Sequence, residues 1–157
     1  MIVFSNTTPL IALSSIGQLE LMPRLFGKVH VVSEVIDECA TGGAISVPRL
    51  RTLNWVLEVQ STPIDQVTPL LALDRGEKHT LDMALKAKAN RVIIDEKLGR
   101  ALAEYLGLTV TGTLGILLHA KQAGWISSFR AVVAEMQEQG IRYHPALIEK
   151  LAASIGE

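Results

Sequence analysis

The chain has 157 residues, 48% of them hydrophobic, 20% charged and 4% aromatic, and its 15 basic and 16 acidic side chains give a net charge of −1. This length predicts a single domain, residues 1–157, that can bury a core without cross-links. The lone cysteine, Cys39, excludes a disulfide framework and a zinc site built from cysteines. The near-neutral charge argues against nucleic-acid binding by bulk electrostatic attraction, although it permits a local basic rim.

The sequence contains no stretch of the ~18 consecutive apolar residues that a membrane span requires. The apolar segment 1–17 has no basic leader and is interrupted by Asn6 and Pro9, so we do not expect a signal peptide. We therefore expect a cytoplasmic protein without a membrane partner.

Short apolar runs alternate with longer helical patterns, which is typical of strand–helix–strand units and a parallel sheet. In chain order, the N-terminal half predicts a strand at 2–4, helices at 9–16 and 19–25, a strand at 29–32, a helix at 34–39, an edge strand at 55–59 and a loop at 61–69. Gly17 and Gly27 are the expected ends of the first two helices, and Ser33 is the expected cap of the third.

The C-terminal half continues the same alternation. It predicts a helical segment at 70–89 broken near Gly76, a strand at 92–94, a helix at 98–106, a strand at 108–110, and helices at 112–124, 127–139 and 145–155. Together these elements predict a three-layer α/β/α sandwich with a short parallel sheet. Ligands of such folds bind at the carboxyl ends of the strands.

Four polar residues follow the predicted strands: Asn6, Glu38, Glu77 and Asp95. In this architecture they can converge on one cleft. A carboxylate cluster without histidine suits a hard cation such as Mg²⁺ or Mn²⁺, which prefers oxygen ligands. Such a metal generates a nucleophile from bound water and stabilises charge during phosphodiester hydrolysis.

Each of these residues also has a purely structural interpretation. Asn6 and Thr8 can organise a turn and cap the first helix. Glu38 can be a solvated helix residue, Glu77 can interact with the helix dipole, and Asp95 can cap the helix that follows it. Spacing alone does not separate these roles from metal binding.

Three sequence blocks carry a family resemblance: SNTTPLIALSSIGQLELMPRLFG, then VHVVSEVIDECATG, then LDRGEKHTLDMALKAKANRVIIDEKLGRALAEYLGLTVTGTLGILLHAKQAGWI. In this order they resemble the PIN-domain superfamily, especially its stand-alone, VapC-toxin-related branch with a GE-type third motif and a DE-x-x-x-R fourth motif. The resemblance is strongest over residues 1–127, and residues 128–157 would add C-terminal helices to one PIN-like domain.

The resemblance implies a metal-dependent endoribonuclease that hydrolyses RNA with Mg²⁺ or Mn²⁺. It also suggests the toxin of a toxin–antitoxin pair, with an antitoxin protein as partner, and a homodimer. Carried over by position, the metal ligands are Asn6, Glu38, Glu77 and Asp95, of which the three carboxylates are also catalytic. Thr8 matches the hydroxyl residue two places after the first ligand and is a candidate substrate-binding residue.

Asn6 departs from the family pattern, in which the first ligand is typically aspartate. An amide oxygen can coordinate a hard cation, but it brings no negative charge and cannot act as a base. We therefore expect weaker metal binding and slower chemistry than four carboxylates would give. The alternative function is a catalytically weakened PIN-like module that binds RNA or protein.

A locally basic segment, residues 75–100, holds seven basic and four acidic side chains, a net charge of +3. Such a run is either a solvated helix face or a rim for a polyanion. Lys97 and Arg100 are candidate substrate-binding residues, and Arg100 matches the fourth motif. Arg100 could clamp a phosphate or orient Asp95, or it could instead pair with Glu96, which we expect to point outward.

The segment VTGTLGILL follows a predicted strand, but it lacks the residues of a phosphate-binding loop. In the resembled family this stretch closes the cleft, which would bring Thr111 or Thr113 near metal-bound water. A receiver-like signalling domain is a weaker hypothesis, since it requires a paired acid before the first strand end and a lone lysine after a late strand. Neither is present in the sequence.

Overall fold

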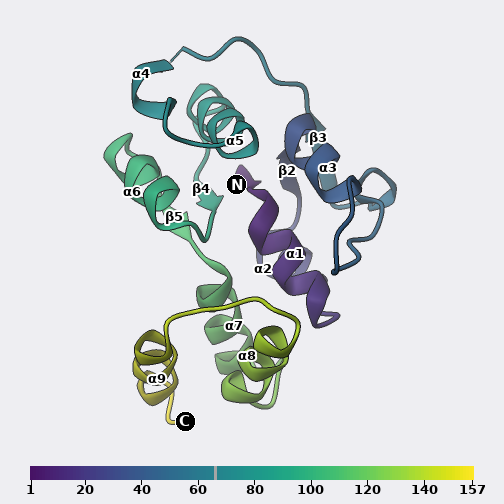
Figure 1. Ribbon diagram of the computed structural model, residues 1–157, viewed down its shortest axis with the longest axis vertical. Coiled ribbons are helices and arrows are strands. Elements are labelled where there is room, and N and C mark those ends of the chain that lie inside the picture. Colours follow the sequence, from purple (N-terminus) through teal and green to yellow (C-terminus); the bar gives the residue numbers. More distant parts are fainter. Residues whose placement is uncertain (66) are drawn as a thin grey trace.

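The computed structural model, which describes residues 1–65 and 67–157, is built around a parallel sheet with the strand order β3-β2-β1-β4-β5 (Figure 1). The strands are β1 (Val3–Ser5), β2 (Val29–Val32), β3 (Val56–Val59), β4 (Arg91–Ile93) and β5 (Val110–Thr111). Every pair of neighbouring strands is parallel. The predicted α/β/α architecture with a short parallel sheet is confirmed, and β3 lies at the predicted edge.

Helices pack around this sheet and continue beyond it. They are α1 (Thr7–Ser15), α2 (Leu21–Phe26), α3 (Ser33–Ala40), α4 (Val67–Leu70), α5 (Arg75–Lys86), α6 (Lys97–Tyr105), α7 (Thr113–Gln122), α8 (Phe129–Glu138) and α9 (Pro145–Ser154), with a 3₁₀ turn at Leu50–Thr52. Helix α5 contacts β1 and β2, α3 contacts α5 and α1, and α7 contacts α1, α2 and α8. Among the described residues, no helix combines the length and the apolar character needed to cross a membrane.

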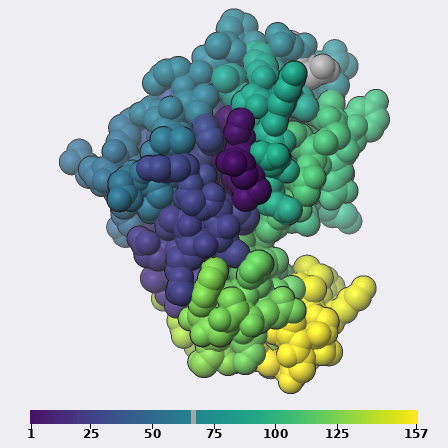
Figure 2. All heavy atoms as spheres, turned by 180° about the vertical axis from the view of Figure 1, so that it is seen from behind, coloured from purple at the N-terminus to yellow at the C-terminus, as the bar shows by residue number. Residues whose placement is uncertain are grey.

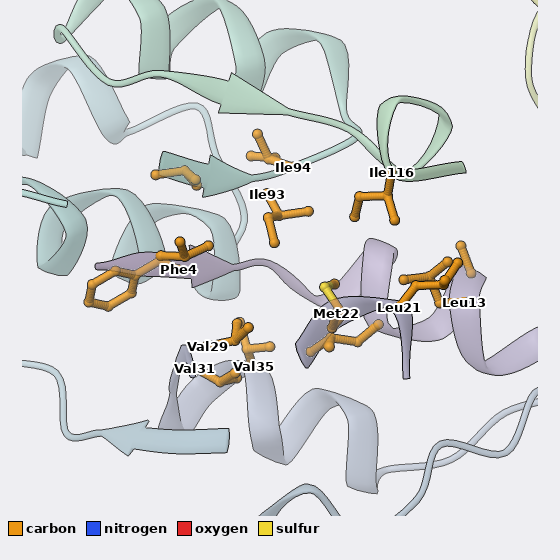
Figure 3. Close-up of a cluster of buried hydrophobic side chains, with 14 of the residues drawn as sticks. Phe4, Leu13, Leu21, Met22, Val29, Val31, Val35, Ile93, Ile94 and Ile116 are labelled. Atoms are coloured by element: carbon orange, nitrogen blue, oxygen red, sulfur yellow. The ribbon is translucent and has the colours of Figure 1, made fainter. Parts of the chain in front are cut away.

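The core consists of apolar side chains from the central strands and the helices beside them (Figure 3). Phe4 and Ile93 of the sheet and Met22 of α2 are at most 1% exposed, and Ile116 of α7 is equally buried. Because helices cover both sides of a parallel sheet, its strands are mainly apolar, and His30 in β2, Glu58 in β3 and Arg91 in β4 are the polar exceptions within those three strands. This explains why runs as short as three residues were sufficient to predict strands.

The strand register brings the site residues to one level of the sheet. Ser5 of β1 is the register partner of Ile93 in β4, and Ile93 is the partner of Thr111 in β5. The backbone N–H of Asn6 donates to the carbonyl oxygen of Ile93 at 2.9 Å. Asn6, Asp95 and the start of α7 therefore lie at the same edge, as the topology predicted.

Two predicted helix starts were wrong. The break in the segment 70–89 precedes Gly76: α4 ends at Leu70, and Asp74 caps α5 by accepting a 2.8 Å hydrogen bond from the backbone N–H of Glu77. Ser33 is the first residue of α3 and does not cap it, because its hydroxyl donates to Glu58 in β3 at 2.8 Å.

The predicted loop at 61–69 extends over position 66, which lies outside the described residues. Its last positions belong to α4, which begins at Val67. Residues 61–65, the part of this predicted loop before position 66, carry no helix or strand.

Phe129, at the start of α8, is fully buried. Its substitution therefore measures how much the packing of the C-terminal helices contributes to stability. We expect Phe129→Ala to lower the free energy of unfolding by about 3–5 kcal/mol, because it deletes buried surface and leaves a cavity. Urea unfolding followed by circular dichroism measures this. The control Leu57→Ala, at a 38% exposed position, should cost less than about 1 kcal/mol; equal losses would contradict the packing.

Candidate functional site

Asn6 follows β1 directly and is 3% exposed. It occupies the N-cap position of α1, yet its side chain makes no capping hydrogen bond. Within the described part of the chain its Oδ1 atom is buried without any hydrogen-bond donor. Leaving a buried acceptor unsatisfied costs about 1–3 kcal/mol, so capping does not explain this side chain.

Glu38 lies on α3 with its carboxylate directed at the neighbouring helices. The hydroxyl of Thr7 donates to Glu38 Oε2 at 2.5 Å. A Cβ atom on residue 76 would lie 2.5 Å from Glu38 Oε1, so only glycine lets the first turn of α5 approach this carboxylate. Glu38 is therefore packed between α1 and α5, and its interpretation as a solvated helix residue was wrong.

The hydroxyl that contacts a predicted ligand belongs to Thr7, whereas the side chain of Thr8 is exposed. Thr7 is the first residue of α1, on the same turn as Thr8. The motif spacing selected Thr8, whereas the hydrogen bond to Glu38 comes from its neighbour Thr7. A role for Thr8 toward substrate stays a prediction.

Glu77 lies in the first turn of α5 and is 6% exposed. Burial, reinforced by the nearby carboxylates of Asp74 and Glu96, raises the pKa of Glu77 to about 8. Its Oε2 atom is buried without a hydrogen-bond partner among the described residues, and a Cβ atom on Gly99 would lie 2.7 Å from it. At neutral pH this carboxyl group is therefore mostly protonated in the metal-free protein.

Glu96 caps α6, since its carboxylate accepts a 2.9 Å hydrogen bond from the backbone N–H of Gly99. The capping role expected for Asp95 thus belongs to Glu96. Although Glu96 is exposed, its carboxylate also acts on the pKa of Glu77, so it borders the site and does not simply point outward.

Asp95 is held by the start of α7 and by the C-terminal segment. Its Oδ1 accepts from the backbone N–H of Thr113 at 2.6 Å, and its Oδ2 accepts from the Thr113 hydroxyl at 2.7 Å and from the Tyr143 hydroxyl at 3.2 Å. Burial, and then the charge of Asp95, raises the pKa of Tyr143 above its usual range, so Tyr143 stays a hydrogen-bond donor. Of the two threonines considered for this cleft, Thr113 is the one that contacts Asp95.

Arg100 forms neither of the ion pairs considered for it within the described residues. Its Nη1 donates instead to the carbonyl oxygen of Ile94 at 3.0 Å. Lys97, the first residue of α6, is exposed. Arg100 lines the same cavity as Asp95, and the role of both cations toward substrate stays a prediction.

The four predicted ligands lie along one edge of the sheet but do not form a closed cluster. Among the described residues, no three His, Cys, Asp or Glu side chains are grouped so that they could hold a metal ion. The Glu38 carboxylate lies against Gly76 and the Glu77 carboxylate against Gly99, whereas both oxygens of Asp95 accept hydrogen bonds from Thr113.

The residues nevertheless fit a hard divalent cation. Asn6 Oδ1 and Glu77 Oε2 are buried oxygens that lack a donor within the described residues. Carboxylate and amide oxygens are the ligand types that Mg²⁺ and Mn²⁺ prefer. The donor set at this edge is therefore of the right chemistry, and within residues 1–65 and 67–157 Asn6 Oδ1 has no donor.

Sequence reasoning missed three residues of this site: Thr7, Asp74 and Tyr143. Asp74 had a signal, because an aspartate three residues before a glutamate is a helix-start signature. Tyr143 had none, since it lies 48 residues after Asp95 in the segment between α8 and α9.

A family model, DUF3368: PIN domain, matches residues 2–157, so the chain belongs to the PIN-domain family. The PIN domain is a nuclease-type fold, and PIN domains generally use divalent metal ions. No curated protein and no solved structure matches the chain.

The raised pKa of Glu77 predicts how stability depends on pH. Its ordinary value is 4.5, so between about pH 5 and 8 the folded chain keeps a proton that the unfolded chain has released. The contribution of Glu77 to stability is therefore lost as pH rises, by about 1 kcal/mol per pH unit in this window. We expect Glu77→Gln to remove this slope in urea unfolding measured with EDTA at pH 5, 6.5 and 8.

Glu20→Gln, at an exposed position, is the matched control and should keep the wild-type slope. Because the wild type and Glu77→Gln share every other titrating group, the difference between their slopes isolates Glu77. A Glu77→Gln protein with the same slope as the wild type would contradict the burial of an uncompensated carboxyl group.

The hydrogen bonds to Asp95 give a second expectation. Thr113→Val removes a 2.7 Å bond from a fully buried hydroxyl and should cost about 2 kcal/mol of stability. Tyr143→Phe removes the longer bond and should cost about 1 kcal/mol. Denaturant unfolding at pH 7 measures both, and the exposed-site control Thr8→Val should change little. A larger loss in Tyr143→Phe than in Thr113→Val would overturn this order.

Proposed function

We propose that this PIN-domain protein is an endoribonuclease that hydrolyses RNA phosphodiester bonds with Mg²⁺ or Mn²⁺. The carrying observation is Asn6 Oδ1, which within the described residues is a buried oxygen without a donor, at the carboxyl edge of a nuclease-type fold. Buried polar atoms are normally satisfied, and a cation held at this edge would satisfy it. Glu38 and Asp95 would complete the ligand set.

When bound, such a metal ion supplies an activated water and neutralises charge on the phosphodiester. The chain prepares its own residues for this. Thr7 orients Glu38 and Thr113 orients Asp95 through short hydrogen bonds. Glu77 is mostly protonated near neutral pH and must release its proton to contribute a negative charge.

Substrate contacts would come from the polar residues around this edge. Lys97 and Arg100 on α6 suit phosphate oxygens, because both are cationic and Arg can bind phosphate through two parallel hydrogen bonds. Thr8 is exposed at the start of α1. The resemblance to VapC-type toxins supports a role as the toxin of a toxin–antitoxin pair, controlled by an antitoxin protein, and a homodimeric state.

A second candidate function rests on Asn6. With an amide at the first position, the ligand set has three carboxylates, and Glu77 enters it protonated near neutral pH. Both features weaken the attraction for a cation. They favour a PIN-like module that binds RNA or protein with little or no cleavage.

An RNA cleavage assay with Mn²⁺ distinguishes these functions. We expect Asp95→Asn to lower the cleavage rate by about 100-fold or more, since even outer-shell changes at metal sites cost 10–100-fold. Asn6→Asp should raise the rate by restoring the fourth carboxylate. Asp37→Asn is the matched control, because it removes an exposed charge next to Glu38 and should leave the rate unchanged.

Cleavage that appears only in Asn6→Asp would identify the weakened module. Full activity in Asp95→Asn would contradict the site. A thermal shift provides an independent measure: Mn²⁺ at 100 times its Kd should stabilise the wild type by about 2.7 kcal/mol. An equal shift in Asp95→Asn would also overturn metal binding at these residues.

A further inference from the structure

A cavity of about 700 Å³ lies next to the candidate site, between the β4–β5 edge of the sheet and the C-terminal helices. Asp95 lines it, and so do Arg91 at the start of β4 and Tyr143 before α9. Figure 2 shows a hollow between the C-terminal helix (yellow) and the part of the molecule that contains the sheet. The volume lies within the ~300–1,000 Å³ typical of small-ligand sites.

Two arginines give the cavity a positive character. Arg91 donates to the hydroxyl of Thr111, and Arg100 donates to the carbonyl of Ile94. Neither forms an ion pair with a carboxylate in the described part of the chain. Each guanidinium has five N–H donors, so donors remain for an anion. A phosphate group carries the negative charge that complements these two arginines.

The cavity also has an apolar wall. Helix α7 contributes Leu114 and Leu118, and α9 contributes Leu147 and Leu151, with the Tyr143 ring beside them. Aromatic side chains bind nucleobases by stacking, and a base presents the flat apolar face that such a wall accommodates. A free phosphate would leave this wall unused, whereas a nucleotide uses both halves of the cavity.

We propose that this cavity binds one nucleotide of a single-stranded RNA, with its phosphate at Arg91 and Arg100 and its base against Tyr143 and the leucines of α7 and α9. The strand must be single-stranded, because a paired base cannot enter a pocket. Asp95 belongs both to this cavity and to the candidate metal ligands, so the inference rests on the proposed function and places the nucleotide next to the scissile phosphodiester.

The test measures RNA binding without metal. A fluorescein-labelled six-residue oligouridylate is titrated in EDTA at low salt, and fluorescence anisotropy gives Kd. We expect Leu147→Glu to weaken binding about tenfold, since it places a negative charge at the rim. Leu57→Glu is the matched control: Leu147 is 43% and Leu57 38% exposed, and Leu57 lies on β3 at the opposite edge of the sheet. It should bind within about twofold of the wild type.

Arg91→Gln should weaken binding by a similar factor, with Arg49→Gln, an exposed arginine outside the cavity, as its control. Circular dichroism melting verifies that all four variants fold. Uridine monophosphate, added in EDTA to the ¹⁵N-labelled protein, should shift the amide signals of Gly112 and Gly115.

The outcomes separate this inference from the ribonuclease proposal. Selective weakening by Leu147→Glu and Arg91→Gln without Mn²⁺-dependent cleavage would support the cavity and contradict the ribonuclease. Cleavage that Asp95→Asn abolishes, combined with unchanged RNA binding in both cavity variants, would contradict the cavity alone. If Leu147→Glu leaves RNA binding intact but changes the mass measured by light scattering, the cavity is a protein interface and the inference is wrong.

Discussion

Three carboxylates at the carboxyl edge of the sheet lie directly against the starts of helices, and in each case a missing Cβ permits the approach. Glu38 lies against Gly76 of α5, Glu77 against Gly99 of α6, and Asp95 against Gly112 before α7. A Cβ atom at any of these glycines would lie within 3.0 Å of a carboxylate oxygen. A side chain at any of these positions would prevent this close approach of a helix start to a carboxylate.

The helix N-terminus is a favourable place for a negative charge, because its free N–H groups and the helix dipole attract anions. Asp95 benefits most, since it accepts a backbone N–H bond and a hydroxyl bond from Thr113. At Glu77 the helix N-terminus does not compensate for burial and for the acidic neighbours, which together raise the pKa of this group to about 8. The edge is therefore stable around Asp95 and electrostatically unfavourable around Glu77, a combination that suits a site completed by a cation.

The C-terminal helices connect this edge to the cavity beside it. Helix α8 packs on α7, α9 packs on α8, and the segment between them brings Tyr143 to Asp95. Tyr143 also lines the cavity that contains Arg91 and Arg100. The contact between Tyr143 and Asp95 therefore joins a candidate metal ligand to the part of the cavity that suits a base.

Local sequence patterns were sufficient for the strands and for the positions of the four candidate ligands. Residues 92–94 are apolar because both faces of the sheet are covered, and the polar Asp95 follows where that cover ends. Local patterns did not identify the residues that cap α3 and α6. Ser33 was the expected cap of α3, but its hydroxyl donates to Glu58 in β3. Asp95 was a possible cap of α6, but the capping residue is Glu96.

The sequence by itself determined the parallel α/β architecture and the chemistry available at its edge, three carboxylates and one amide, because these depend on residue type and local periodicity. Only the tertiary structure decided how these groups behave. The bond from Thr7 to Glu38 spans 31 residues and the bond from Tyr143 to Asp95 spans 48. The orphaned oxygen of Asn6 and the high pKa of Glu77 likewise arise from burial by distant segments. Desolvation and long-range contacts are properties of the packed chain, so no local pattern encodes them.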